Sequence, residues 1–328
     1  MVAPGLGGVL PKSVGFSGLE DSMKLAHLAA SVAIFASVFV GTASAEDKKP
    51  VVGLVMKSLA NEFFQNMLEG AKKHEAERGD FVMKAVGMQS ETDIETQINA
   101  VENMITEKVD AIVIAPADSR ALVAPLKKAV EAGITVVNFD VSLDEQAKKE
   151  ANFELAFVGP DNRGGAKLSG DALAAKLGKG GKVVIIEGNP SADNANQRKL
   201  GFMDSVEAGG LTLIDSATAH WETEEANTVF TNMLTAHPEI QGVMAANDSM
   251  AVGVVKALEA AGRKDIQVVG FDNIPAVGPM IADGRILATV DQFGQAMAAN
   301  GIDRAIEVLK GGPKLEGWVK TDIKLVTK

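Results

Sequence analysis

The chain contains no cysteine, and this absence excludes several kinds of site at once. Disulfide bonds, thiolate zinc sites and thiol nucleophiles are all removed. Histidine is also scarce: the four residues are His27, His74, His220 and His237, and no two of them stand at metal-ligand spacing. We therefore interpret the histidines as surface or capping residues and expect neither a metal nor a cofactor.

The motifs of common enzyme classes are missing as well. No strand is followed by G-x-G-x-x-G or a Walker loop, and there is no G-x-S-x-G elbow. The glycines of Gly178–Lys182 precede their strand and indicate a turn, and Gly159–Gly165 reads as a link between two lobes. Asp140 and Asp272 could act as an acid and a base, but nothing near them in sequence resembles a nucleophile. These observations argue against an enzyme.

Basic residues are too few to balance the acidic ones. The 32 Lys and Arg residues against 43 Asp and Glu residues leave a formal net charge of −11. Such a surface repels phosphates, which argues against a nucleic-acid partner. The chain is 46% hydrophobic and 23% charged, as is typical of a soluble globular protein. Its 328 residues predict two domains at roughly 100–200 residues each.

Long hydrophobic runs are missing, with one short exception near the start of the chain. An apolar run from about Leu28 to Val40 follows Lys24 and precedes the small residues Ala43-Ser44-Ala45. This order is typical of a secretory signal peptide, which we place at residues 23–45. The run is short for roughly 30 Å of hydrocarbon, so a permanent membrane anchor is the weaker alternative.

Met23 is a plausible start for this signal, and residues 1–22 then form an upstream extension. We expect cleavage after about Ala45, release of the mature chain, and a location in the periplasm. No cysteine stands at the cleavage point, so the sequence does not indicate a lipid anchor.

Short apolar runs alternate with helical patterns along the rest of the chain. The predicted strands are Val51–Met56, Phe81–Val86, Ala111–Ala115, Val136–Phe139, Val183–Glu187, Leu211–Ala217, Gly242–Ala246, Gln267–Phe271, Ala288–Asp291 and Ile323–Val326. The predicted helices are about 63–75, Ile94–Glu107, Arg120–Ala132, Ala166–Lys176, Gln197–Ala208, Glu224–Ala236, Met250–Ala261 and Gln295–Lys310. This alternation predicts an α/β fold with parallel sheets covered by helices on both faces, in two similar lobes that divide near Gly159.

Polar and aromatic residues gather where the predicted strands end, which is where open α/β sheets bind ligands. These segments are Ser58–Phe64, Asn138–Asp140, Asn194–Arg198, His220-Trp221, Asn247-Asp248 and Asp272-Asn273. Carboxylates, amides and a guanidinium can pair with hydroxyls, and flat rings pack against the C–H faces of a sugar. The pattern therefore favours a sugar site. Core packing is the alternative for one of Phe63 and Phe64, and surface or hinge packing is the alternative for Trp221.

From about Pro50 to Lys328, the chain resembles the ribose-binding type of periplasmic ABC-transporter proteins. The resemblance is carried by the order and spacing of Asn61-x-Phe63-Phe64, Ala115–Ser119, Phe139-Asp140, Arg198-x-x-Gly201-Phe202, Thr235–Pro238, Ala246-Asn247-Asp248-x-Met250-Ala251, Val269–Asp272 and Lys324–Val326. It implies two Rossmann-like lobes joined by a three-strand hinge, the type I periplasmic binding protein fold. The N-terminal lobe would comprise residues 46–160 and 293–321, and the C-terminal lobe residues 161–292 and 322–328.

The resemblance also implies a set of ligand contacts. They are Asn61, Phe63, Phe64, Asp140, Arg198, Trp221, Asn247, Asp272 and Gln292. Phe63 and Phe64 would sandwich the sugar from the first lobe, Trp221 would stack on its opposite face, and the polar residues would bond its hydroxyls.

Two positions depart from the family pattern. Ribose binders typically place an arginine directly after the aspartate of the Phe139-Asp140 segment, and here that residue is Val141. The site loses several N–H donors and a positive charge. We therefore expect Asp140 to depend more on Arg198 and on backbone donors, and a less hydroxylated sugar, a deoxy or modified sugar, or a polyol to be favoured over ribose. Glu62 replaces a common proline and is the smaller departure.

The function that the resemblance implies is capture of a pentose-like monosaccharide or sugar alcohol by hinge closure, because such a ligand contacts both lobes only when they close. A monomer would then deliver it to an ABC permease in the inner membrane. A periplasmic sensor that presents its ligand to a chemoreceptor or sensor kinase is the alternative. A sugar-responsive repressor shares the two-lobe core, but it would need an N-terminal helix-turn-helix where this chain has an export signal.

Overall fold

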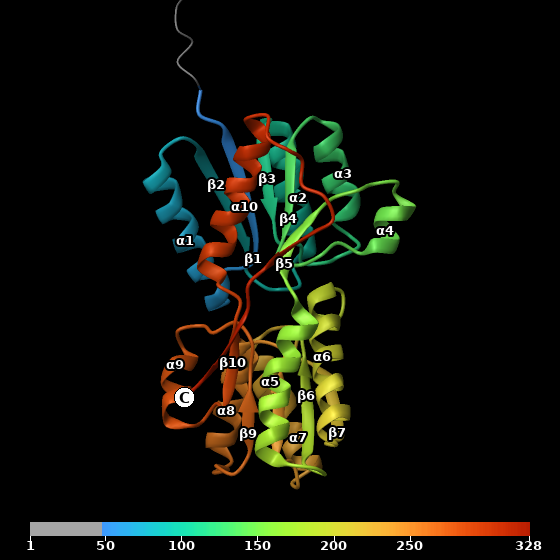
Figure 1. Ribbon diagram of the computed structural model, residues 1–328, viewed down its shortest axis with the longest axis vertical. Helices are drawn as coiled ribbons and strands as arrows, with labels where there is room; N and C mark the ends of the chain where they lie inside the picture. The colour runs from blue at the N-terminus through green and yellow to red at the C-terminus, as the bar shows by residue number, and fades with distance from the viewer. Residues whose placement is uncertain (1–47) are drawn as a thin grey trace, which may run out of the picture. The chain divides into compact units, whose positions relative to one another are not determined.

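The computed structural model describes residues 48–328. The predicted upstream extension, the signal peptide and its cleavage point at Ala45 lie outside the described residues. Within residues 48–328, no helix combines the length and the apolar character needed to cross a membrane. The same residues form two lobes, each built on a six-stranded sheet with helices on both faces (Figure 1).

The first lobe contains an all-parallel sheet in the order β11-β5-β4-β3-β1-β2. Its strands are β1 (Val51–Ser58), β2 (Val82–Met88), β3 (Ala111–Ile114), β4 (Thr135–Phe139), β5 (Phe157–Pro160) and β11 (Trp318–Thr321). Its helices are α1 (Glu62–Arg78), α2 (Ile94–Glu107), α3 (Val123–Glu131), α4 (Glu145–Glu150) and α10 (Gly294–Leu309). Helices α1 and α10 pack together on one face, and α2 and α3 cover the other.

The second lobe repeats this plan in the order β12-β10-β9-β8-β6-β7. Its strands are β6 (Lys182–Glu187), β7 (Thr212–Thr218), β8 (Gly242–Ala245), β9 (Gln267–Val269), β10 (Ala288–Asp291) and β12 (Lys324–Thr327). Its helices are α5 (Asn162–Leu177), α6 (Asp193–Gly209), α7 (Thr223–Ala236), α8 (Asp248–Ala260) and α9 (Val277–Asp283). The pair α5 and α6 covers one face, and α7 and α8 the other.

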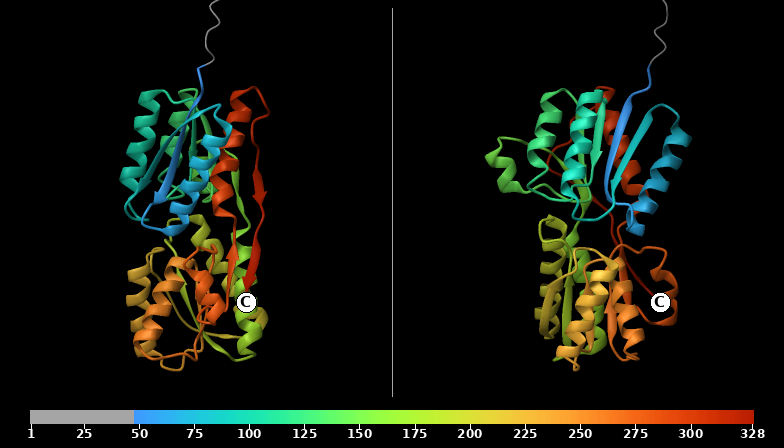
Figure 2. Two further views of the ribbon diagram at one scale, coloured as in Figure 1. Left: turned by 90° about the vertical axis from the view of Figure 1, so that its left-hand side faces the viewer. Right: turned by 180° about the vertical axis from the view of Figure 1, so that it is seen from behind.

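The chain passes between the lobes three times, from β5 to α5, from β10 to α10, and from β11 to β12 (Figures 1 and 2). The predicted α/β fold class with two lobes is confirmed. The sequence missed the short elements β5, α4, α9 and β11. It also began α5 at Ala166 instead of Asn162, so most of the predicted link Gly159–Gly165 is regular structure. The prediction of parallel sheets was wrong for one pair, because β12 runs antiparallel to β10.

The two sheets are held by apolar residues on both faces. Every residue of β3 is buried, as expected of a central strand in a parallel sheet. One apolar cluster lies between the first sheet and α2 and α3, around Val101, Ile112 and Leu126. A larger cluster runs under α1 and α10 and continues through the second lobe. Each fully buried aliphatic side chain contributes roughly 1.5–3 kcal/mol by leaving water.

Helix starts bring polar side chains to the space between the lobes. Asn61 caps α1 by accepting a hydrogen bond from the Phe63 N–H at 3.0 Å. Asn247 caps α8 in the same way, with the Met250 N–H donating at 2.9 Å. Asparagine is a preferred N-cap because its side-chain oxygen satisfies a backbone donor that the first helical turn leaves free. The loops at the carboxyl ends of β1 and β8 are thereby fixed against the facing lobe.

Candidate ligand-binding site

The two lobes meet around a small cavity at the carboxyl ends of their strands. Its twelve lining residues are Lys57, Asn61, Phe63, Phe64, Glu91, Asp140, Asn194, Arg198, Trp221, Asn247, Asp272 and Gln292. All nine residues that the sequence predicted for the site are in this set. Lys57, Glu91 and Asn194 complete it. None of the three was among the predicted contacts, although Asn194 begins one of the polar segments predicted at strand ends. The first lobe and the second lobe both contribute, so the cavity is complete only when the lobes are together.

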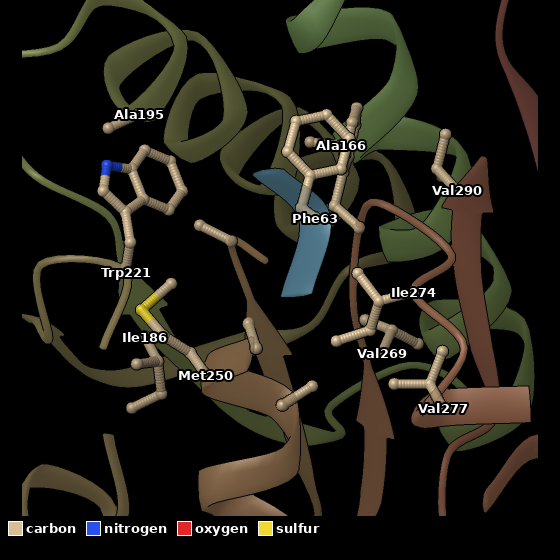
Figure 3. Close-up of a cluster of buried hydrophobic side chains, with 14 of the residues drawn as sticks. Phe63, Ala166, Ile186, Ala195, Trp221, Met250, Val269, Ile274, Val277 and Val290 are labelled. Atoms are coloured by element: carbon tan, nitrogen blue, oxygen red, sulfur yellow. The ribbon is translucent and has the colours of Figure 1, made fainter. Parts of the chain in front are cut away.

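Aromatic rings form the apolar walls of the cavity. Phe63 and Phe64 meet edge to face, with ring centroids 5.1 Å apart. Trp221 stands at the end of β7 in the other lobe and is 3% exposed. Phe63 and Trp221 belong to the larger buried apolar cluster, together with Ile186 and Met250 (Figure 3). The rings are therefore fixed from behind by packed side chains and present rigid faces to the cavity.

The Trp221 indole is held in place by its backbone and by a glycine. Both His220 and Trp221 have positive φ, at 46° and 73°. Such a conformation costs about 1–3 kcal/mol for a non-glycine residue and is concentrated at functional sites. Gly188 allows the ring to approach, because a Cβ there would lie 2.2 Å from the indole. The Asn247 amide donates to the Trp221 carbonyl at 3.4 Å, which ties the turn to the start of α8.

A buried network joins Arg198, Asp272 and Gln292 on the second-lobe side. The Arg198 Nη1 lies 3.3 Å from the Asp272 Oδ1 and donates to the Ala246 carbonyl at 2.9 Å. Its Nε donates to the Asn162 Oδ1 at 2.9 Å. The Gln292 Nε2 donates to the Asp272 Oδ1 at 2.6 Å, which turns the Gln292 carbonyl oxygen away from that carboxylate. These contacts hold the three polar groups in single orientations before any ligand arrives.

A second buried pair, Lys57 and Glu91, lies on the first-lobe side. The Lys57 Nζ is 3.0 Å from the Glu91 Oε2, and both side chains are almost fully buried. The same ammonium lies 5.1 Å from the Trp221 ring centroid and 5.6 Å from that of Phe64. The Glu91 Oε1 accepts from the Asn61 amide at 2.8 Å. Lys57 therefore places a cation among the aromatic walls.

The sequence prediction for Asp140 needs a correction here. Val141 is fully buried and is not among the lining residues, so the arginine typical of ribose binders has no counterpart at that position. The cation that acts most strongly on Asp140 is Lys57, ahead of Arg198. The signal for Lys57 and Glu91 was available, because each stands near the carboxyl end of a predicted strand. Their side-chain directions were not readable from spacing alone.

Several buried polar atoms of the lining residues have no hydrogen-bond partner. Within residues 48–328, the lining atoms that are buried and make no hydrogen bond are Asp140 Oδ1, Asn194 Oδ1, Gln292 Oε1, Trp221 Nε1 and Glu91 Oε2. The last of these has the Lys57 ammonium beside it. The remaining four are three acceptors and one donor. A buried polar atom left without a partner costs about 1–3 kcal/mol, so a ligand that pairs with these atoms recovers that free energy.

Burial also raises the pKa values of two carboxyl groups in the site. Desolvation raises the pKa of Asp140 to about 6, although Lys57 and Arg198 act to lower it. Desolvation likewise raises the pKa of Asp272 to about 7 against the attraction of Arg198, and the nearby Asp140 adds to the rise. Both carboxyl groups are thus poorly solvated when the cavity is closed and empty.

We expect empty closure to depend on pH. Opening hydrates Asp140 and Asp272 and returns their pKa values towards about 4, so closing the empty cleft takes up protons between about pH 4 and pH 7. The closed form therefore gains stability as the pH falls through this window and loses it as the pH rises. Small-angle scattering of the ligand-free protein is expected to show a ratio of closed to open molecules at least about tenfold higher at pH 5 than at pH 7.5, since one pKa unit corresponds to 1.36 kcal/mol.

The double variant Asp140→Asn with Asp272→Asn provides the control for this pH dependence, because its amides do not titrate. Its scattering curve is expected to differ less between the two pH values than that of the parent. Some difference remains because desolvation also raises the pKa values of Asp193 and Glu222, which lie at contacts between the lobes. An equal radius of gyration for the parent protein at pH 5 and pH 7.5 would contradict the expectation.

Direct contacts between the lobes surround the cavity. The Ser249 hydroxyl donates to the Asn61 Oδ1 at 3.1 Å, and the Glu91 N–H donates to the Glu222 Oε1 at 3.1 Å. Ser119 makes a further contact between the lobes through its side chain. Its hydroxyl accepts from the Asp193 N–H at 2.9 Å and donates to the Ser142 carbonyl at 2.7 Å. Ser119 therefore connects the first lobe to the start of α6, away from the lining of the cavity.

Replacing Ser119 with alanine is expected to weaken ligand binding by about three- to tenfold. The change removes one hydrogen bond that exists only in the closed form, from the Asp193 N–H to the Ser119 hydroxyl, with a net worth of about 0.5–1.5 kcal/mol. Because Ser119 does not line the cavity, the factor is expected to be the same for every ligand in isothermal titration calorimetry. Ser142→Ala is the matched control, since its hydroxyl bonds only to the adjacent Leu143 carbonyl. A factor that differed between ligands would assign Ser119 to the site instead.

A closed cavity between two α/β lobes, with rigid aromatic walls and unpaired hydrogen-bonding atoms, defines a binding protein for a small polar solute. The chain belongs to the periplasmic binding protein domain family, whose profile matches residues 52–313. This is a family of solute-binding transport proteins and not of enzymes. Within residues 48–328, no cluster of acidic and histidine side chains has the arrangement of a metal site.

Similar proteins are known from several bacteria. A D-ribose/D-allose-binding protein of Pseudomonas aeruginosa is 48% identical over 285 residues, which is 85% of this chain and 89% of the relative. An ABC-transporter solute-binding protein of Burkholderia multivorans, whose structure holds an unknown ligand represented as α-D-erythrofuranose, superposes with a TM-score of 0.82 at 47% identity and covers 85% of this chain and 99% of its own. One from Actinobacillus succinogenes with bound D-allose gives 0.81 at 37% identity, over 85% and 98% of the two chains.

Proposed function

We propose that this protein captures one uncharged monosaccharide between its lobes and delivers it to an ABC permease. The observation that carries the proposal is the set of buried, unpaired cavity atoms at Asp140, Asn194, Gln292 and Trp221. Three of the atoms accept hydrogen bonds and one donates. A polyhydroxylated ligand meets this demand, because each sugar hydroxyl can donate one hydrogen bond and accept others.

The charges in the site favour an uncharged ligand. Lys57 and Arg198 already face Glu91 and Asp272, so no cation among the lining residues is left without a counter-ion. A carboxylate or phosphate on the ligand would supply only acceptors to a cavity that needs donors. It would also lie near Asp140, whose burial already disfavours its charged form. Sugar acids and sugar phosphates are therefore expected to bind poorly.

The aromatic walls of the cavity favour a single sugar ring. The opposed walls, Phe63 and Phe64 against Trp221, match the two C–H faces of one ring. D-Ribose and D-allose are the first candidates, because proteins with 48% and 37% identity to this chain carry these names or ligands.

Lys57 changes which sugars we expect. The sequence alone favoured a less hydroxylated ligand, because Val141 removes the positive charge that ribose binders carry after the aspartate. The Lys57 ammonium restores a cation next to Asp140 from a different strand. A fully hydroxylated aldose such as D-allose is therefore as well accommodated as a deoxy sugar or a polyol.

A ligand screen tests the proposal. Thermal-shift measurements at pH 7.5 would compare D-ribose, D-allose, ribitol and D-ribose 5-phosphate with the unliganded protein. Binding at a thousandfold excess over the dissociation constant adds about 4 kcal/mol of apparent stability. We expect at least one aldose to stabilise the protein and the phosphate to have no effect. Stabilisation by the phosphate alone, or by no neutral sugar or polyol, would overturn the proposal.

Export and transport complete the proposed role. The signal peptide over residues 23–45 would send the chain to the periplasm, with cleavage after about Ala45. We propose that the mature protein works as a monomer whose closed form is recognised by the permease. A sensor that presents the same closed form to a chemoreceptor or sensor kinase is the alternative, and cross-linking in membranes to a permease or to a sensor domain distinguishes the two.

A further inference from the structure

Asn194 differs from the other asparagines that line the cavity. The oxygen of Asn61 accepts the Phe63 N–H, and that of Asn247 accepts the Met250 N–H. The Asn194 Oδ1 is buried and accepts no hydrogen bond from residues 48–328, although the residue itself is only 4% exposed. Of these three side-chain oxygens, the Asn194 Oδ1 is therefore the one that does not cap a helix.

The start of α6 does not need Asn194. The N-cap position is Ala192, which has no side-chain cap, and the Asp193 N–H is satisfied instead by the Ser119 hydroxyl across the lobe interface. Asn194 stands one helical turn before Arg198, on the same face of the helix. Its neighbour Ala195 lies beside the Trp221 indole (Figure 3). This turn of α6 thus faces the cavity next to its second-lobe aromatic wall.

We propose that Asn194 is a specificity-determining residue that selects for a hydroxyl group at one position of the sugar ring. This inference rests on the proposed function. A hydroxyl at that position donates its proton to the Oδ1 of Asn194. A ligand that carries hydrogen or a methoxy group there leaves the buried oxygen unpaired, and binding then includes the full desolvation cost of that oxygen. Sites built to bond a hydroxyl reject the analogue that lacks it far more strongly than apolar pockets reject an extra group.

The test combines one substitution with a ligand series. Asn194→Ala and the parent protein would be titrated by calorimetry with D-ribose, D-allose and the monodeoxy analogues of both. For the parent, we expect one deoxy position to weaken binding by at least tenfold. For Asn194→Ala, we expect the complete sugar to bind about tenfold more weakly, and the analogue lacking that one hydroxyl to bind at least as well as it binds the parent. The preference for the hydroxyl would therefore fall at least tenfold.

A second substitution separates hydrogen bonding from packing. Asn194→Leu keeps a side chain of similar size but has no acceptor, so it is expected to lose the same preference as Asn194→Ala. Asn196→Ala is the matched control. Asn196 is an exposed residue on the same helix, and its amide donates to the Pro190 carbonyl at 3.1 Å outside the cavity lining. We expect its ligand preferences to equal those of the parent.

The outcomes distinguish this inference from the proposed function. If the parent protein binds none of the sugars, the proposed function fails. If it binds them and the ratio of affinities for each sugar and its deoxy analogues is unchanged in both Asn194 variants, then Asn194 does not determine specificity. A uniform loss across every analogue leads to the same conclusion, because it indicates a structural role. Thermal melts of the unliganded variants verify that each one is folded.

Discussion

Replacing Trp221 with alanine is expected to weaken sugar binding by about a hundredfold, close to 2.7 kcal/mol. The substitution removes the aromatic wall that the second lobe contributes to the cavity. It also removes the Trp221 Nε1, which is the donor among the buried cavity atoms that have no hydrogen-bond partner. The Phe63 and Phe64 rings would remain on the opposite side, so the sugar would stack on one face only. Isothermal titration calorimetry with the tightest sugar of the screen gives the measurement.

Trp318 provides the matched control. It is the second of the two tryptophans in the chain, lies on β11, and is 47% exposed. Its indole donates to the Gly159 carbonyl at 2.9 Å and does not line the cavity. Trp318→Phe is expected to bind sugar like the parent. It also leaves Trp221 as the one tryptophan, so the intrinsic fluorescence of this variant is expected to change on sugar binding. Unaltered affinity in Trp221→Ala would show that the sugar binds elsewhere.

Much of the fold was predictable because local patterns and tertiary structure agree in this chain. Central strands such as Ala111–Ile114 are short, apolar and fully buried, so their pattern is unambiguous. The missed elements lie where this agreement is weaker. Strand β11 alternates exposed and partly buried residues at the edge of its sheet, and it contains only four residues. Its pairing with β5 depends on a contact between residues about 160 positions apart, which no local pattern encodes.

The site was predictable to the extent that strand ends define it. Side chains that follow β4, β7, β8 and β9 converge because the carboxyl ends of parallel strands share one edge of each sheet. The direction of a side chain at that edge depends on details that spacing does not carry. Asp140, Trp221 and Asp272 all have positive φ, which points them differently from residues in regular strands. Lys57 was missed because its burial depends on its pairing with Glu91 from another loop, which sequence spacing does not show.

The hydrogen bonds in the structure also change how the polar residues of the site are interpreted. Asn61 was predicted to bond the sugar, but both ends of its amide are already engaged, by Phe63 and Ser249 at the oxygen and by Glu91 at the nitrogen. In the closed form it positions α1 and Glu91 and presents little free bonding capacity. The unpaired atoms of Asp140, Asn194 and Gln292 are better placed to meet the ligand. Helix capping and ligand binding use the same residue types, so only the three-dimensional structure shows which of the two roles a given residue has.

Replacing Asp272 with alanine is expected to have the largest effect, a loss of about a thousandfold in sugar affinity. The Asp272 Oδ1 accepts from both Arg198 and Gln292, so truncation frees two donors and leaves the Arg198 guanidinium without its carboxylate in a buried site. Removing one partner of a buried, hydrogen-bonded charge pair costs about 2–5 kcal/mol or more. Much of that cost arises only on closure, because an open cleft would hydrate the arginine.

Asp272→Asn separates charge from shape in this prediction. The amide keeps an oxygen that can accept a hydrogen bond from Gln292. Burial raises the pKa of Asp272 to about 7, so the carboxyl group of the parent protein is already neutral in part of the closed, empty molecules near pH 7. We therefore expect the asparagine variant to lose less affinity than the alanine variant. Its sugar affinity is also expected to vary less between pH 5 and pH 8.

Asp265→Ala is the control for Asp272→Ala, because it removes a carboxylate that pairs with an arginine in the same lobe, Arg263, but at an exposed position. Exposed pairs contribute roughly 0–1 kcal/mol, and neither residue of this pair lines the cavity, so sugar binding is expected to be unchanged. Equal, small losses of sugar affinity in Asp272→Ala and Asp265→Ala would contradict the proposed site. They would mean that the buried pair of Arg198 and Asp272 does not face the ligand. A large loss in the first variant alone would tie sugar affinity to a charge pair that is fully enclosed only when the two lobes meet.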